Sequence, residues 1–268
     1  MICGSFTLSG SGDTLSAWGD FYPDDEGLSY YQVRKGVFNG GYYLHRRLPL
    51  TGDDFYFYDS ENDLLVLFSG YIYNKTELAD RYGFDADESV PRTAARLFLK
   101  EGSEFVRRVN GDFVIFIAQP ANRRAYLFRD QVGIRPVAYS ADNGRLHFSS
   151  DINGLCRHLA GKKHVSGEFL LGFFKYIDLT ITPSDRVRRL LPGHYLEYSE
   201  SGVRLTRYWD PERIKTDNNM GYNEMLSELK KLVEDAVRIR CDSRFMAGSH
   251  VSSGLDSCTV AALARRNY

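Results

Sequence analysis

Short apolar runs rich in aromatic residues, each bounded by turn-forming residues, dominate the sequence from its start to about residue 208. Runs of this kind, about four to eight residues long, are typical of β-strands. The segments between them, such as 59–63, 120–122 and 141–144, carry Asp, Asn, Pro and Gly residues that favour turns. Strands are therefore predicted over residues 55–59, 64–68, 113–118, 124–128, 137–139 and 146–148.

Helical patterns interrupt this succession of strands. Residues 75–81 form a short helical pattern, and residues 91–100 begin with proline and end before Gly102. A third, apolar helix is predicted over residues 166–175. Many strands with a few helices indicate packed sheets flanked by helices, so we expect an α+β domain over residues 1–210.

The character of the sequence changes after Trp209. Residues 211–220 have the polar composition of a linker, whereas residues 222–240 repeat apolar side chains with the helical period. Residues 246–251 suggest an apolar strand, and residues 259–266 a second helix. This order is typical of the opening of an α/β nucleotide-binding domain. We expect that domain over residues 221–268, and we expect it to continue beyond the given sequence.

The loop between the predicted strand and the last helix is rich in small and hydroxyl-bearing residues. Its candidate ATP-binding residues are Val251, Ser252, Ser253, Gly254, Asp256 and Ser257. Backbone amides, hydroxyls and the amino end of a helix together can bind a phosphate group. Gly254 would let the backbone approach such a group closely. The alternative interpretation is an ordinary capped turn.

Composition narrows the classes of partner. Hydrophobic residues make up 43% of the chain and aromatic residues 14%, enough for a buried core. The net charge of -1 gives no reason to expect nucleic acid or an anionic membrane as partner. The first residues lack the basic start and long apolar stretch typical of a signal peptide. No apolar run approaches the roughly 20 residues that a membrane helix needs. Its four cysteines lie far apart, which favours neither a metal site nor a disulfide framework. We expect a cytoplasmic protein.

Several segments, in order along nearly the whole chain, resemble motifs of the asparagine-synthetase family. They are 3–4 (CG), 45–48 (HRRL), 69–74 (SGYIYN), 110–113 (NGDF), 129–136 (RDQVGIRP), 148–151 (FSSD), 187–194 (VRRLLPGH), 208–210 (YWD) and 252–257 (SSGLDS). Each fragment alone is uninformative. The ordered set makes coincidence improbable.

This resemblance implies two domains. The first is a class II glutamine amidotransferase domain, an αββα sandwich of the Ntn-hydrolase type, which releases ammonia from glutamine. The second is an ATP pyrophosphatase domain of the adenine-nucleotide hydrolase type. It uses ATP and Mg²⁺ to adenylate a small-molecule or peptide carboxylate, and ammonia or an amine then displaces AMP. In this family Ser252–Ser257 would surround the pyrophosphate, with Ser253 standing where glycine is usual. Asp256 would orient the loop or contact magnesium indirectly.

The resemblance also assigns glutamine-site residues and exposes departures from the family pattern. Cys3 would be the nucleophile, but the family nucleophile uses its own α-amine as base, and here Ile2 precedes Cys3. Arg47 would hold the substrate carboxylate, and Ser69 with Gly70 would stabilise the oxyanion.

Ser69, however, replaces an asparagine and Tyr71 a glutamate, and Val90 falls where an aspartate holds the glutamine amine. The His-Arg-Gly-Pro-Asp segment of the family is missing as well. We therefore expect impaired or lost glutaminase activity. The alternative reading of Cys3 is a small buried hydrophobe.

Several interpretations stay open. The chain resembles an amide-forming ligase, which either makes asparagine or closes a ring, as β-lactam synthetases and lasso-peptide cyclases do. An active glutaminase fragment and a non-catalytic scaffold are the other candidates. A homodimer is a further expectation.

Overall fold

The computed structural model describes residues 1–8, 18, 27–160, 165–172, 174, 178–216 and 219–268. The chain divides into two compact units, Met1–Asp210 and Pro211–Tyr268. The first unit contains both β-sheets, and the described residues of the second form two α-helices and one short 3-10 helix.

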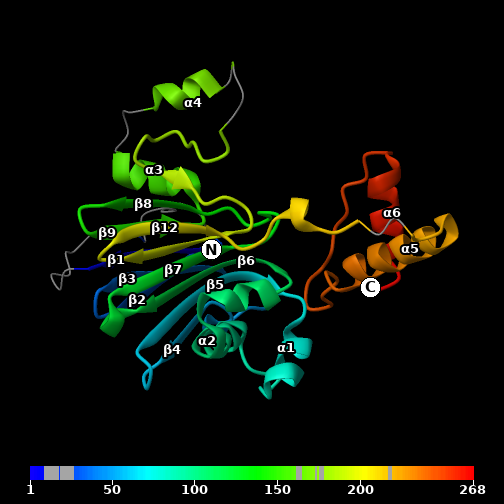
Figure 1. Cartoon of the computed structure of the whole chain (residues 1–268), viewed down its shortest axis with the longest axis horizontal. Helices are drawn as coiled ribbons and strands as arrows, with labels where there is room; N and C mark the ends of the chain where they lie inside the picture. The colour runs from blue at the N-terminus through cyan, green and yellow to red at the C-terminus, as the bar shows by residue number, and fades with distance from the viewer. Residues whose placement is uncertain (9–17, 19–26, 161–164, 173, 175–177, 217–218) are drawn as a thin grey trace. The chain divides into compact units, whose positions relative to one another are not determined.

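Each sheet of the first unit has six strands, and every neighbouring pair runs antiparallel (Figure 1). The first sheet has the order β10 (Arg188–Arg189), β8 (Ala138–Asp142), β9 (Arg145–Ser149), β1 (Ile2–Thr7), β3 (Phe38–His45) and β2 (Leu28–Lys35). The second has the order β12 (Gly202–Arg207), β11 (His194–Ser199), β7 (Arg124–Arg129), β6 (Gly111–Gln119), β5 (Leu64–Ile72) and β4 (Tyr56–Asp59).

Side chains of the two sheets meet in an aromatic core. Because successive strand residues point to opposite faces, β6 sends Val114 and Phe116 between the sheets. The same strand sends Ile115 outward to the helices. The Phe116 ring lies against the Phe148 ring of the first sheet, with centroids 4.2 Å apart.

Helices cover the outer face of each sheet. The second sheet packs against α1 (Lys75–Tyr82) and α2 (Val90–Glu101), while α3 (Ile152–Ala160) lies on the first sheet (Figure 1). Shorter helices are α4 (Gly167–Gly172), η2 (Gly52–Asp54), η3 (Gly102–Arg108), η4 (Pro120–Asn122) and η5 (Pro211–Arg213). The α+β sandwich of helix, sheet, sheet and helix layers expected from the sequence is therefore confirmed.

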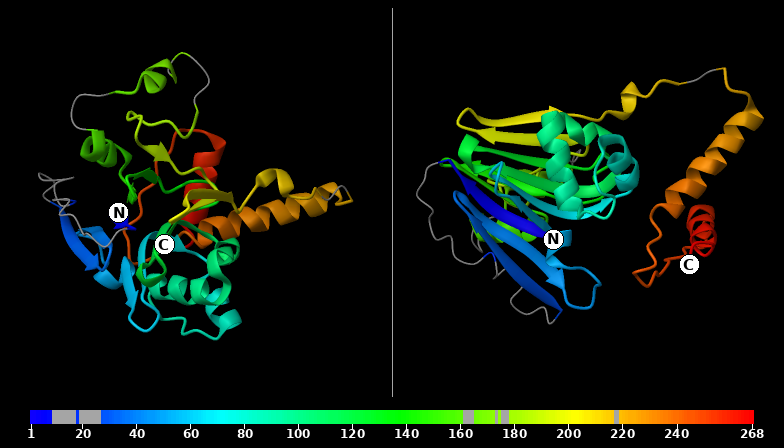
Figure 2. Two further views of the ribbon diagram at one scale, coloured as in Figure 1. Left: turned by 60° about the vertical axis from the view of Figure 1, so that its left-hand side comes forward. Right: turned by 90° about the horizontal axis from the view of Figure 1, so that it is seen from below.

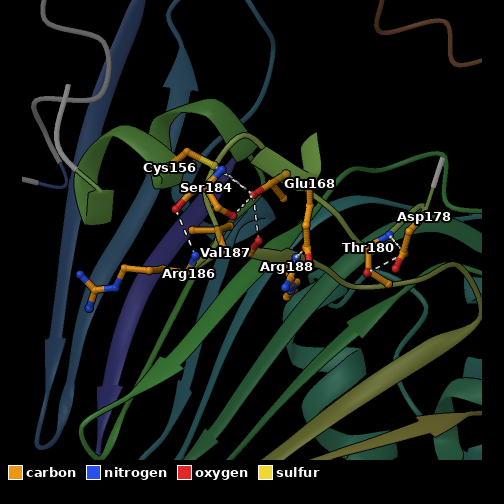
Figure 3. Close-up of polar contacts among 9 residues, drawn as sticks. Cys156, Glu168, Asp178, Thr180, Ser184, Arg186, Val187 and Arg188 are labelled. Carbon is orange, nitrogen blue, oxygen red and sulfur yellow. Dashed lines mark hydrogen bonds and ion pairs between the residues drawn. The ribbon is translucent and has the colours of Figure 1, made fainter. Parts of the chain in front are cut away.

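A buried threonine anchors residues 182–187, which precede β10. The hydroxyl of Thr182 lies within hydrogen-bonding distance of the carbonyl oxygens of Ser184 and Val187, at 2.9 and 2.8 Å. Its oxygen also accepts a weak bond from the thiol of Cys156 on α3, at 3.5 Å. Figure 3 shows Cys156, Ser184 and Val187 converging on this point. The segment is thus fixed to the helix that covers the first sheet.

The loop after β7 fixes the end of the first unit. The buried carboxylate of Asp130 accepts the amides of Ile134 and Arg135, both at 2.9 Å. The Tyr208 hydroxyl donates to the carbonyl oxygen of Arg129 at 2.7 Å. The Asp130 bonds hold the loop together, and the Tyr208 bond ties the end of the first unit back to β7 of the second sheet.

The second unit contains α5 (Tyr222–Arg238) and α6 (Leu255–Ala264), which Figure 2 shows in orange and red. The strand predicted over residues 246–251 is wrong, because in the described part of this unit these residues form no β-ladder. A strand needs a neighbour to pair with its backbone, and the described residues of this unit supply none.

Most other expected elements are confirmed, with boundaries shifted by a few residues. The strands predicted from apolar runs correspond to β4 to β9, and the helices at 75–81 and 91–100 to α1 and α2. The helix predicted at 166–175 is confirmed only over Gly167–Gly172, and residues 173 and 175–177 lie outside the described residues. The apolar runs did not predict β1, β2, β3, β10, β11, β12 or α3.

The inter-sheet core gives a direct stability prediction. Phe116→Ala should lower the free energy of unfolding by about 3–5 kcal/mol, because it removes a fully buried ring stacked on Phe148. Urea denaturation followed by circular dichroism measures the change. Val132→Ala is the control, since Val132 is 60% exposed and should shift stability by less than about 0.5 kcal/mol. A loss below about 1 kcal/mol for Phe116→Ala would contradict the described core.

Candidate functional site

Cys3 lies in the middle of the first sheet. It sits on β1 between Gly41 of β3 and Ser149 of β9, and its side chain has no exposed surface. It joins a cluster with Leu155 and Cys156 of α3. The structure thus surrounds the predicted nucleophile with the packing of the α3 layer.

This environment opposes thiolate formation. Burial raises the pKa of the Cys3 thiol well above its ordinary range, because desolvation penalises the charged thiolate. Burial also lowers the pKa of the Met1 amine to about 5, which leaves it a weak base. The nitrogen of Cys3 itself is a peptide nitrogen, since Ile2 precedes it. Cys3 is therefore a neutral, buried thiol near neutral pH.

Aromatic side chains cover the neighbourhood of Cys3. A Cβ atom at Gly41, directly opposite Cys3, would lie 3.0 Å from the Tyr30 ring. Tyr30 packs against Tyr43 with ring centroids 5.0 Å apart, and Tyr43 belongs to the same buried cluster as Cys3. Trp18 also belongs to that cluster and stacks on His158 of α3, at 4.7 Å. These side chains belong to or pack against the buried cluster that contains Cys3.

The other predicted glutamine-site residues lie elsewhere. Ser69 is on β5 in alternation with Leu65 and Leu67, which enter the core between the sheets. On β1 it is Ile2 that enters this core, whereas Cys3 points to the opposite face. The structure therefore does not bring the Cys3 thiol and the Ser69 hydroxyl to the same face of the first sheet.

Gly70 and Arg47 complete the predicted glutamine pocket. Gly70 has a φ of +133°, and a side chain there would collide with the carbonyl oxygen of Asp112. Its conformation thus follows from the close approach of β6. Arg47 is exposed in the turn after β3, and its amide donates to Nδ1 of His45 at 3.2 Å. Val90, expected at the position of the family's aspartate, begins α2.

Sequence reasoning missed the aromatic cover over Cys3. Tyr30 and Trp18 lie outside the recognised motifs, and Trp18 is far from Cys3 along the chain. The adjacent glycines Gly40 and Gly41 could have indicated this packing, because a glycine within a strand often marks the close approach of another group.

The loop before α6 does assemble its predicted residues. The Ser257 hydroxyl accepts the amide of Ser252 at 3.2 Å, and the two serine hydroxyls are 3.1 Å apart. Ser257 also donates to the carbonyl oxygen of Gly254 at 3.2 Å. Ser253 has a φ of +65°, in the left-handed region that favours glycine. Two hydroxyls therefore lie beside the amino end of α6, which carries Asp256 in its first turn.

These groups have the chemistry to hold a phosphate. Gly254 caps α6 without a side-chain bond, so the first-turn amides of this ten-residue helix remain available to a ligand. Their partial positive charge favours an anion, and the hydroxyls add donors. Among the described residues, no group of three or more His, Cys, Asp or Glu side chains could hold a metal ion. None of the described helices has the length and hydropathy needed to cross a bilayer.

The buried state of Cys3 predicts its reactivity. When the native protein is treated with iodoacetamide at pH 8, the exposed Cys258 should be alkylated at least about 100-fold faster than Cys3, because the buried thiol is both inaccessible and protonated. Peptide mass spectrometry resolves the two rates, and unfolding in urea should equalise them. Equal rates in the native protein would contradict the described environment.

Two protein families match successive parts of the chain. Residues 39–209 match the family described as "Glutamine amidotransferase domain", and residues 228–268 match "Asparagine synthase". A putative glutamine-hydrolysing asparagine synthetase 2 of Methanocaldococcus jannaschii is 25% identical over 91% of this chain and 51% of its own length. Asparagine synthetase 2 of Bacillus subtilis is 26% identical over 98% of this chain and 36% of its own.

A third relative has a different name. The amidase chyE of Penicillium rubens is 26% identical over 81% of this chain and 33% of its own length. The chain thus spans about half or less of the length of these relatives. It belongs to the asparagine synthetase family, with a class II glutamine amidotransferase domain followed by the start of an asparagine synthase domain.

Proposed function

We propose that this chain is part of an ATP-dependent ligase that forms a carbon–nitrogen bond, with a nitrogen donor that is not released from glutamine at Cys3. The observation that carries the proposal is the Ser252–Ser257 loop, which gathers hydroxyls at the amino end of α6 within the asparagine synthase match. Such domains use ATP in this family, and the loop has the donor set that a pyrophosphate requires.

The proposed reaction has two steps. A substrate carboxylate oxygen attacks the α-phosphorus of ATP, and pyrophosphate leaves with the electron pair of the broken P–O bond. Ammonia or an amine then attacks the acyl carbon and loses a proton, and AMP leaves. Hydroxyls of Ser252 and Ser257, with first-turn amides of α6, would bind the pyrophosphate and stabilise its growing charge. Mg²⁺ would be held chiefly by nucleotide phosphates, since Asp256 is the one carboxylate in the loop.

Burial of Cys3 supports a donor other than glutamine. A glutaminase nucleophile must reach the substrate carbonyl as a thiolate. Here the Cys3 thiol is enclosed and its pKa is raised. Cys3 faces away from the core between the two sheets, whereas Ser69 alternates with the core residues of β5. Free ammonia or an amine of the carboxylate substrate itself would bypass this domain. An internal amine corresponds to ring closure, and ammonia to a simple amide product.

Nucleotide binding tests the loop. Ser252→Ala and Ser257→Ala should each weaken Mg-ATP binding by about tenfold or more, because each removes a hydrogen bond to a charged phosphate. Equilibrium dialysis of the purified chain with labelled ATP measures the affinity. Ser249→Ala, just outside the loop, is the matched control and should change it less than twofold. Unchanged Mg-ATP affinity in both loop variants would contradict the proposal that Ser252 and Ser257 bind the phosphates.

Glutamine hydrolysis tests the other half of the proposal. The purified chain should release no glutamate above the blank at pH 8, and Cys3→Ala should leave that background unchanged, because the thiol is not accessible. Coupled glutamate dehydrogenase detection measures the release. Glutamate production that disappears in Cys3→Ala would show a working glutaminase.

A further inference from the structure

Two histidines meet where α3 packs on the first sheet. His147 lies on β9 between Leu146 and Phe148, which enter the core between the sheets. Its own side chain therefore points to the opposite face, where α3 lies and carries His158. The Trp18 ring stacks on the His158 ring with centroids 4.7 Å apart, and it lies 6.3 Å from the His147 ring. These three rings form a histidine–tryptophan cluster between the helix and the sheet.

The surroundings of His147 favour its neutral form. The side chain is 6% exposed, and its Nδ1 atom is buried with no hydrogen-bond partner among the residues that the structure describes. Directly opposite it lie Ser5 on β1 and Ser140 on β8, and neither carries a charge. A proton on this ring would therefore place a positive charge in a buried, poorly compensated position.

Charged groups around His147 add to the effect of burial. Burial is the largest cause of its lowered pKa, and His158 lowers the pKa further. Arg145 of β9 and Arg186 also lower it, whereas Asp142 of β8 raises it. Asp142 is already paired with Arg186 at 2.6 Å. The pKa of His147 is thus about 4, and burial lowers the pKa of His158 as well, so both rings are neutral at pH 7.

The helix that carries His158 also covers the two thiols of the first unit. Cys3 of β1 and Cys156 of α3 belong to the same buried cluster as Trp18. Two bonds from the segment before β10 reach α3. The Cys156 thiol donates weakly to the Thr182 hydroxyl at 3.5 Å, and the exposed Arg186 side chain donates to a carbonyl oxygen of α3 at 3.2 Å. Neither bond is strong enough to hold α3 against a buried charge.

We propose that α3 is an acid-sensitive cover of the first sheet, which loosens when His147 and His158 take up protons and thereby exposes the thiols of Cys3 and Cys156. Two imidazolium ions in one cluster repel each other, and burial deprives both of water. Movement of α3 away from the sheet relieves both costs. This behaviour is independent of the ligase chemistry of the second unit.

The direction of the pH effect follows from the lowered pKa values. A histidine whose pKa is lower in the closed form than in the open form binds protons preferentially in the open form. Opening therefore becomes easier as the pH falls from about 6.5, the ordinary histidine value, towards about 4, where His147 titrates in the closed form. Within this window His147 alone raises the opening equilibrium about tenfold per pH unit, and by about 50-fold between pH 7.5 and 4.5.

Thiol labelling over a range of pH tests the proposal on the purified chain. The probe is 4,4′-dithiodipyridine, which reacts with thiols in acid as well as in neutral solution, and peptide mass spectrometry resolves the labelled cysteines. The exposed Cys258 is the internal reference for the intrinsic reaction rate. Labelling of Cys3 and Cys156 relative to Cys258 should rise by about 50-fold or more between pH 7.5 and 4.5.

Substitutions at His147 identify the group that responds. His147→Phe keeps a ring without an ionisable nitrogen and should reduce this rise at least about tenfold. His147→Gln, which is uncharged and smaller, should do the same and serves where the phenylalanine ring does not fit. His250→Gln is the control, because His250 is an exposed histidine of the second unit and should leave the rise unchanged.

Three results would overturn the proposal. A constant labelling ratio across this pH range would show that α3 does not loosen in acid. An undiminished rise in both His147 variants would show that another group drives the opening. Loss of hydrogen-exchange protection of the β6 amides together with thiol exposure would show that the whole first unit unfolds in acid. Continued protection of β6 at pH 4.5, with both thiols labelled, supports loosening of α3 alone.

Discussion

The strict alternation of side chains along β1 is the constraint on which the first unit depends. Ile2 and Phe6 enter the aromatic core between the sheets, so Cys3 must point to the other face, where α3 lies. The register of β1 with β3 and β9 fixes this assignment, because a slip by one residue would turn every core side chain outward. A strand in the centre of a packed sheet has no freedom to present Cys3 differently.

The burial of Cys3 follows from that constraint. The same packing that stabilises the sandwich desolvates the Cys3 thiol and places Tyr30 over Gly41. The Ser252–Ser257 loop, in contrast to Cys3, lies outside any buried core. Ser252 and Ser253 are exposed and Ser257 is half-buried, and the hydroxyls of Ser252 and Ser257 bond within the loop. A ligand can replace these bonds without unfolding a core. Chemistry is therefore better supported at the second unit than at the first.

Much of the first unit could be predicted from the sequence. Apolar runs such as that of β6 appear because a strand covered on both faces is apolar throughout. The helix at α2 was evident from its starting proline and its terminal glycine. The cover over Cys3 could not be predicted, because it depends on pairing between strands distant in sequence. The strand at 246–251 was wrongly predicted for a related reason, since local pattern carries no information about whether a pairing partner is present.

We propose that ligand chemistry resides in the Ser252–Ser257 loop and not at Cys3. Amide-resolved NMR of the labelled chain, titrated first with Mg-ATP and then with glutamine, tests both parts in one sample. We expect Mg-ATP to shift the amide signals of Ser252, Gly254 and Ser257, and glutamine to leave those of Cys3, Gly41 and Ser69 unchanged. Saturable shifts around Cys3 with glutamine, and none in the loop with Mg-ATP, would contradict it.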